Sequence, residues 1–100
     1  MNRLYVRRFL NSPGHHGGAY VLAVVERIRP DDNLDRWSDF PILELADCSR
    51  RVMFDFPLHN ASARRNSLRK ARLLAEICNR FADALAAEAT AISERGRRRS

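Results

Sequence analysis

The sequence predicts one small α+β domain, in which a four-stranded antiparallel sheet precedes a long amphipathic helix that packs on it, in the order β-β-β-β-α. Three observations predict this fold class. The chain has 100 residues, which fits a single domain with one core. Its first half holds four short segments rich in β-branched and aromatic residues, separated by clusters of turn residues. Residues 61–93 contain neither proline nor glycine, and their apolar residues recur with a helical period.

The first two strands are predicted on either side of the densest turn signal in the chain. Residues 3–10 alternate, so that Leu4 and Val6 lie on one side and Tyr5, Arg7 and Phe9 on the other. Residues 11–18 supply asparagine, serine, proline, histidine and three glycines for the turn. Residues 19–29 then form a second strand, which is apolar on both faces and is therefore expected to be covered on both.

An acidic loop and a hairpin follow. Residues 30–41 are bracketed by two prolines and carry four aspartates around Trp37, which predicts a surface loop. Trp37 is either an exposed contact residue or an anchor tucked against the sheet. Residues 42–46 and 51–56 form the hairpin around a turn at 47–50, with inward side chains at Leu43, Leu45, Val52, Phe54 and Phe56.

The helix is predicted from residue 61 to about residue 93, with Gly96 ending it. Its apolar stripe is spaced by three or four residues and consists of Ala71, Leu74, Cys78, Phe81, Leu85, Ala89 and Ile92. The stripe is widened on one flank by Leu73, Ile77 and Ala84. Such a helix is longer than a seven-residue strand, and its apolar surface is wider than contact with one sheet requires. We therefore expect these three residues to mediate homodimerisation. The alternative is a kinked or frayed helix end.

The charge is concentrated at the C-terminus. The formal net charge is +6, yet residues 1–94 hold 14 basic and 12 acidic residues, which is only +2. We therefore expect residues 1–94 to form the domain and residues 95–100 to be a disordered basic tail that meets phosphates or acidic surfaces. The basic residues of this tail are Arg95, Arg97, Arg98 and Arg99.

The start of the helix carries basic residues where the helix dipole favours acidic ones. Arg64, Arg65, Arg69 and Lys70 crowd its first turns, and neither Ser62 nor Ser67 begins a capping box. Free helix amides beside clustered arginines predict an anion site. Its occupant is a phosphate backbone, an acidic patch on a protein partner, or the chain's own acidic loop.

No motif for catalysis, metal or nucleotide binding is recognised. Residues 14–18 lack the Gly-Lys-Ser/Thr ending of a phosphate loop. His15, His16 and His59 do not have metal-ligand spacing. Cys48 and Cys78 are expected to be buried free thiols, because no secretory segment accompanies them. We therefore expect no enzyme activity, no cofactor, no metal and no small-molecule substrate.

The segment from Leu43 to Phe56, followed by Asn66-Ser67-Leu68-Arg69-Lys70 and an alanine-rich helix, resembles small uncharacterised proteins of actinobacterial phages. The similarity covers residues 40–90 and rests on the succession of strand, turn and helix. It implies a product of a phage that infects a GC-rich host, consistent with one lysine against 17 arginines. The resemblance supplies no catalytic residue.

Two functions are consistent with these observations. The first is a homodimeric interaction module that engages a host or viral protein through Trp37 and the basic helix start. The second is a nucleic-acid-binding protein that uses the arginine tail with Arg64, Arg65 and Arg69, although no nucleic-acid-binding motif is recognised. The absence of an 18-residue apolar run predicts no membrane association, and we expect the protein in the cytoplasm.

Overall fold

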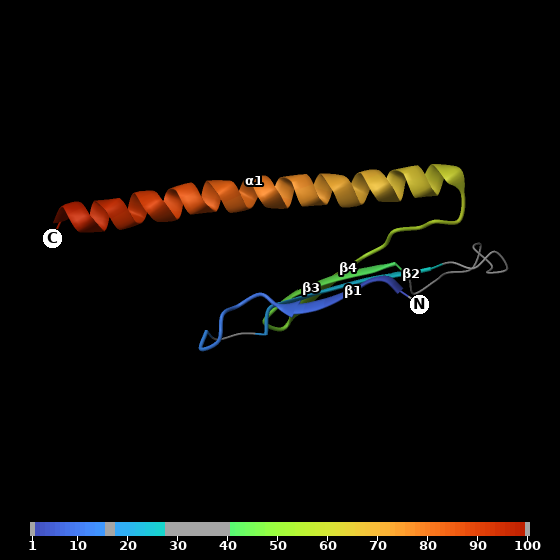
Figure 1. The fold of residues 1–100 in the computed structure, drawn as a ribbon, viewed down its shortest axis with the longest axis horizontal. Coiled ribbons are helices and arrows are strands. Elements are labelled where there is room, and N and C mark those ends of the chain that lie inside the picture. The colour runs from blue at the N-terminus through green and yellow to red at the C-terminus, as the bar shows by residue number, and fades with distance from the viewer. Residues whose placement is uncertain (1, 16–17, 28–40, 100) are drawn as a thin grey trace. The chain divides into compact units, whose positions relative to one another are not determined.

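A computed structural model describes residues 2–15, 18–27 and 41–99 of the chain (Figure 1). Four strands come first, and one long helix follows. The strands are β1 (Asn2–Phe9), β2 (Tyr20–Glu26), β3 (Ile42–Asp47) and β4 (Arg50–Phe54), and the helix is α1 (Ala61–Arg99). This arrangement confirms the predicted α+β class and the order of the elements.

The chain divides into two compact units, Met1–Ser67 and Leu68–Ser100. The first unit contains the sheet and the first two turns of α1, and the second contains the rest of that helix. Each unit is described by itself below. The packing of the helix on the sheet therefore stays a prediction.

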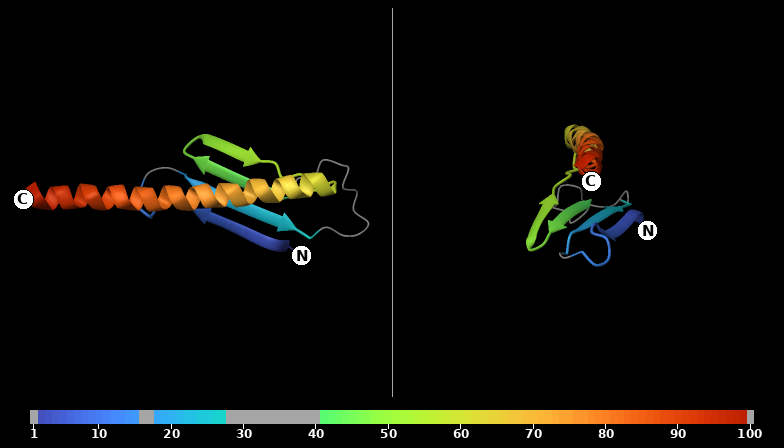
Figure 2. Two further views of the ribbon diagram at one scale, coloured as in Figure 1. Left: turned by 90° about the horizontal axis from the view of Figure 1, so that it is seen from above. Right: turned by 90° about the vertical axis from the view of Figure 1, so that its left-hand side faces the viewer.

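The four strands form one antiparallel sheet in the order β1-β2-β3-β4, so that each strand pairs with its neighbour in sequence (Figure 2). The register is consistent across the sheet, because Val6 pairs with Ala23, Ala23 with Leu43 and Leu43 with Phe54. These residues therefore share one face. Leu45 and Val52, which were predicted to point inward, pair on this same face, but Val52 is 49% exposed.

Burial within the described residues is limited. The buried apolar side chains are those of Ala19, Val24 and Ala46, and no large side chain is fully buried. Val24 lies on β2, whose other residues are all half-buried, as expected for a strand at the centre of the sheet. β2 ends at Glu26, shorter than the strand predicted to residue 29; residues 28 and 29 lie outside the described residues.

A two-residue turn joins β3 to β4. Asp47 pairs with Arg50, which leaves Cys48 and Ser49 at the tip. Cys48 has a φ of 56°, whereas Ser49 does not have a positive φ, and this is the pattern of a type II′ turn. The prediction that Cys48 and Cys78 are buried thiols is wrong, since both are free and exposed. The tip of a hairpin has no neighbouring layer to cover it.

The helix α1 spans 39 residues, or about 58 Å, and runs unbroken in Figure 1. It continues through Gly96 to Arg99, so the predicted end at Gly96 is wrong. A glycine inside a helix costs only about 1 kcal/mol, and no proline follows it. The arginines beyond it are favoured by the helix dipole, because cations are stabilised near a helix C-terminus.

Candidate interaction surfaces

The apolar stripe of α1 is largely exposed in the single chain. Phe81 is 67% exposed and Leu85 57%, and only Leu74 among the large residues of the stripe is half-buried. On the flank predicted to mediate homodimerisation, Leu73 and Ile77 are 43% and 48% exposed, and Ala84 is also exposed. Single exposed apolar residues are ordinary, but a continuous stripe of them indicates a contact surface.

The start of α1 is capped by a residue that the sequence analysis missed. The backbone N–H of Ala63 donates to Oδ1 of Asn60 at 2.7 Å, and the backbone N–H of Arg64 donates to the carbonyl of Asn60 at 3.0 Å. Asparagine is among the best N-cap residues because its side-chain oxygen satisfies an amide of the first turn. The expectation that these helix amides are free is therefore wrong for Ala63. The signal was present in the sequence as an asparagine directly before the proline-free and glycine-free segment.

Two further hydrogen bonds join the first turns of α1 to the segment before it. The hydroxyl of Ser67, which is buried, donates to the carbonyl of Pro57 at 2.7 Å. The guanidinium of Arg64 donates to the carbonyl of Leu58 at 3.0 Å. Arg64 thus has a structural contact within its own chain, although four of its five N–H donors do not take part in that bond.

The other residues predicted for partner or anion binding have different surroundings. Arg65 and Arg69 are exposed, and Lys70 is half-buried. No acidic residue stands in the first turn of α1. Trp37 and the acidic loop from Asp31 to Asp39 lie outside the described residues. The structure thus places the basic residues on consecutive turns of one helix and leaves their anionic occupant a prediction.

The basic residues at the C-terminus belong to the last turns of α1. Arg95, Arg97 and Arg98 are exposed. Nη2 of Arg95 lies 3.5 Å from Oε1 of Glu88, in a pair whose side chains are both 66% exposed. Such exposed pairs contribute little to stability. Arg99 ends the helix, and its side chain lies outside the described part.

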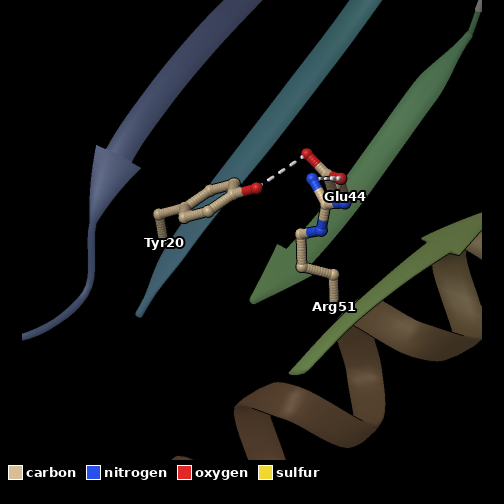
Figure 3. A network of polar contacts seen from close by, with 3 residues as sticks. All are labelled: Tyr20, Glu44 and Arg51. Atoms are coloured by element: carbon tan, nitrogen blue, oxygen red, sulfur yellow. Dashed lines mark hydrogen bonds and ion pairs between the residues drawn. The ribbon is translucent and has the colours of Figure 1, made fainter. Parts of the chain in front are cut away.

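A polar contact crosses three strands of the sheet (Figure 3). The hydroxyl of Tyr20 on β2 donates to Oε2 of Glu44 on β3 at 3.0 Å. Nη1 of Arg51 on β4 lies 3.8 Å from Oε1 of the same carboxylate, whose side chain is 13% exposed. Both contacts run diagonally, since Tyr20 pairs in register with Ala46 and Ala46 pairs with Arg51. They join the strands and do not resemble a catalytic arrangement.

The outermost strand β1 exposes aromatic side chains. Tyr5 is 61% exposed and Phe9 72%, and the two lie on the same face because they are four residues apart on one strand. Arg7 lies between them and is also exposed. The register between β1 and β2 is irregular between Asn2 and Leu4, which places a bulge at Arg3.

The described residues contain no candidate metal site and no candidate membrane span. No cluster of three or more His, Cys, Asp or Glu side chains there is arranged to hold a metal ion. In the same part of the chain, no helix is both long enough and apolar enough to cross a membrane.

Comparison with known proteins gives no relatives: no family model, no curated protein and no solved structure matches this chain.

Proposed function

We propose that this chain is a homodimeric, non-enzymatic interaction module that engages a host or viral protein. The single observation that carries the proposal is the exposed apolar stripe along α1. A soluble helix normally turns such a stripe toward a core, and burying the exposed half of a leucine or phenylalanine is worth about 1 kcal/mol. Five large stripe and flank residues of this helix are exposed: Leu73, Ile77, Phe81, Leu85 and Ile92. A second copy of the chain is the simplest partner for them.

The origin and location of the protein are part of the proposal. A bacteriophage origin is proposed on the resemblance of residues 40–90 alone. The host cytoplasm is proposed because the composition is that of a globular protein and the apolar runs are short.

Self-association is tested by the mass of the protein in solution. We expect a dimer for the natural sequence and a monomer for Ile77→Asp and Leu85→Asp, because each places a charge in the apolar contact without a partner. The matched control is Thr90→Asp, which adds the same charge on the exposed side of the helix away from the stripe. Light scattering of all four proteins at one concentration gives the answer. A dimer for both stripe variants contradicts the assignment.

Partner binding is tested by affinity capture with nuclease treatment. We expect a protein that survives nuclease and is lost with the double variant Arg65→Glu/Arg69→Glu. These arginines are exposed and take part in none of the contacts that hold the helix start, unlike Arg64. The control is Arg8→Glu/Arg50→Glu on exposed positions of the sheet, which changes the net charge equally. A captured protein that binds both double variants equally does not use the helix start.

Nucleic-acid binding is the second candidate, and the exposed arginines at both ends of α1 favour it. Each phosphate that a cation neutralises steepens the dependence of log affinity on log salt concentration by about 0.9. Deleting residues 95–100 is then expected to weaken binding. It is also expected to reduce the steepness of that slope by about three or four times 0.9. If the chain is a protein-interaction module, the same deletion leaves partner affinity nearly unchanged.

A further inference from the structure

We propose that the second copy binds α1 antiparallel, about a two-fold axis that lies at the level of residue 79 on the face that carries Lys70 and Glu88. This inference rests on the proposed self-association and adds its orientation and register. It is carried by the positions of two opposite charges along the helix, Lys70 and Glu88, and by the side chains between them.

Glu88 interrupts the apolar surface of α1. Leu74 and Phe81 are seven residues apart, and the next position in that series is Glu88. A seven-residue repeat is the spacing with which one helix faces another. A carboxylate at such a position is costly to bury, and a partner helix that covers Glu88 lowers this cost when it supplies a positive charge in addition to that of Arg95.

Lys70 lies on the same side of the helix as Glu88. The two residues are 18 positions apart, which is five full turns of an α-helix, so their side chains leave the helix in the same direction. They are also about 27 Å apart along the axis, which prevents them from pairing within one chain. In the single chain Glu88 instead lies 3.5 Å from Arg95 across an exposed surface.

An antiparallel two-fold axis brings these two charges together. The two helices run in opposite directions about this axis. Each flank of one helix lies beside the same flank of its partner. The level of residue 79 is midway between the two charges along the helix. With the axis at this level, Lys70 of each copy meets Glu88 of the other. The contact is made twice in every dimer.

The same axis also aligns the apolar residues. On one flank Leu73 lies beside Ala84 of the second copy, which joins a large side chain to a small one, and on the other flank Leu74 lies beside Leu85. Ile77 and Phe81 lie closer to the axis, where each is near its own copy in the partner. All six residues belong to the stripe or to its flank, and Ile77, Phe81 and Leu85 are each about half exposed or more in the single chain.

The net charges of the helix segments favour this orientation over a parallel one. Residues 61–75 contain five basic residues and no acidic one, whereas residues 83–94 contain three acidic residues and no basic one. The antiparallel axis sets these segments against each other. A parallel pair would set each segment against its own copy, with Lys70 beside Lys70 and Glu88 beside Glu88, and like charges in contact are destabilising.

Cysteine cross-linking distinguishes the two orientations. In a Cys48→Ser background, the Cys78 side chains of the two copies are offset by about 3 Å along the helix axes, so a short thiol-specific cross-linker is expected to join them. In a Cys48→Ser/Cys78→Ala/Ile92→Cys variant, the two new thiols are about 39 Å apart and are expected not to react together. The cysteine-free protein is the control for both.

Each result decides between arrangements. Cross-linking at residue 78 alone supports the inference. Cross-linking at both positions indicates a parallel dimer, and cross-linking at residue 92 alone or at neither position in a dimeric protein places the contact elsewhere; all three overturn it. A monomeric mass for the natural sequence overturns the proposed self-association itself, so the two failures are distinguishable.

A charge exchange tests the register. Lys70→Glu and Glu88→Lys are each expected to raise the dimer dissociation constant on the order of tenfold, since each places two pairs of like charges in the contact. The double variant Lys70→Glu/Glu88→Lys restores both pairs and is expected to return the constant to within a few fold of the natural value. Circular dichroism checks that helix content is unchanged. A double variant weaker than either single variant overturns the register.

Discussion

Asn60 shows how one short side chain fixes where the helix begins. It accepts a hydrogen bond from the N–H of Ala63, while Ser67 and Arg64 bond to the carbonyls of Pro57 and Leu58. Together these contacts hold the segment before α1 against the first two turns. Sequence analysis placed the helix start at residue 61 correctly and did not identify the cap, because Ser62 and Ser67 offered competing candidates. When several neighbouring residues carry a hydroxyl or an amide, the path of the backbone decides which of them caps the helix.

We expect Asn60→Ala to lower the free energy of unfolding by about 1 kcal/mol, because an amide of the first turn loses its partner. Denaturant unfolding followed by circular dichroism measures the change. Ser62→Ala is the matched control, since Ser62 is exposed and does not cap the helix; its effect is expected within about 0.5 kcal/mol of zero. Equal losses in the two variants would mean that Asn60 does not act as the cap.

At the scale of elements, the strands were predictable and the end of the helix was not. Alternating apolar residues and turn clusters identified all four strands in order, since a half-buried strand has a period of two. Gly96 is a common helix terminator, yet α1 continues through it to Arg99. A Cβ atom at Gly96 would meet nothing within 4 Å, so no close approach there requires glycine.

We therefore expect Gly96→Ala to stabilise the last turns of α1. Alanine is favoured over glycine inside a helix by roughly 0.5–1 kcal/mol, and the site has room for the methyl group. Amide hydrogen exchange of residues 93–99 is expected to slow by about three- to fivefold, with the exchange of the sheet unchanged. Faster exchange in the variant would indicate that the helix ends before residue 96.

At the scale of the whole molecule, the fold class was predictable because hydrophobic period and turn chemistry are local properties of a sequence. The partner was not predictable. An exposed stripe such as that of α1 shows which surface has to be covered, and it does not identify the molecule that covers it. The same holds for the basic helix start, where the residues were found but the anion was not. Trp37, which belongs to the first functional hypothesis, lies outside the described residues.

The stability of the whole protein is expected to depend on its concentration. No large side chain of the described residues is fully buried, so the proposed dimer contact supplies much of the apolar burial. For a protein that unfolds as it dissociates, the melting temperature rises with concentration, here by roughly 3–4 °C for each tenfold increase. Calorimetry at three concentrations measures this rise. Ile77→Asp is expected to melt at a lower temperature that does not vary with concentration.

The edge strands of the sheet are the places at which the protein is expected to aggregate when its folding is disturbed. In the described part of the chain, β1 and β4 are the outermost strands, and each has one row of backbone groups that no neighbouring described strand pairs with. Such rows are templates on which further chains add and build fibrils. The bulge at Arg3 and the charges of Arg7 and Arg8 oppose that growth on β1. These arginines are therefore expected to keep further chains from adding to the edge of β1.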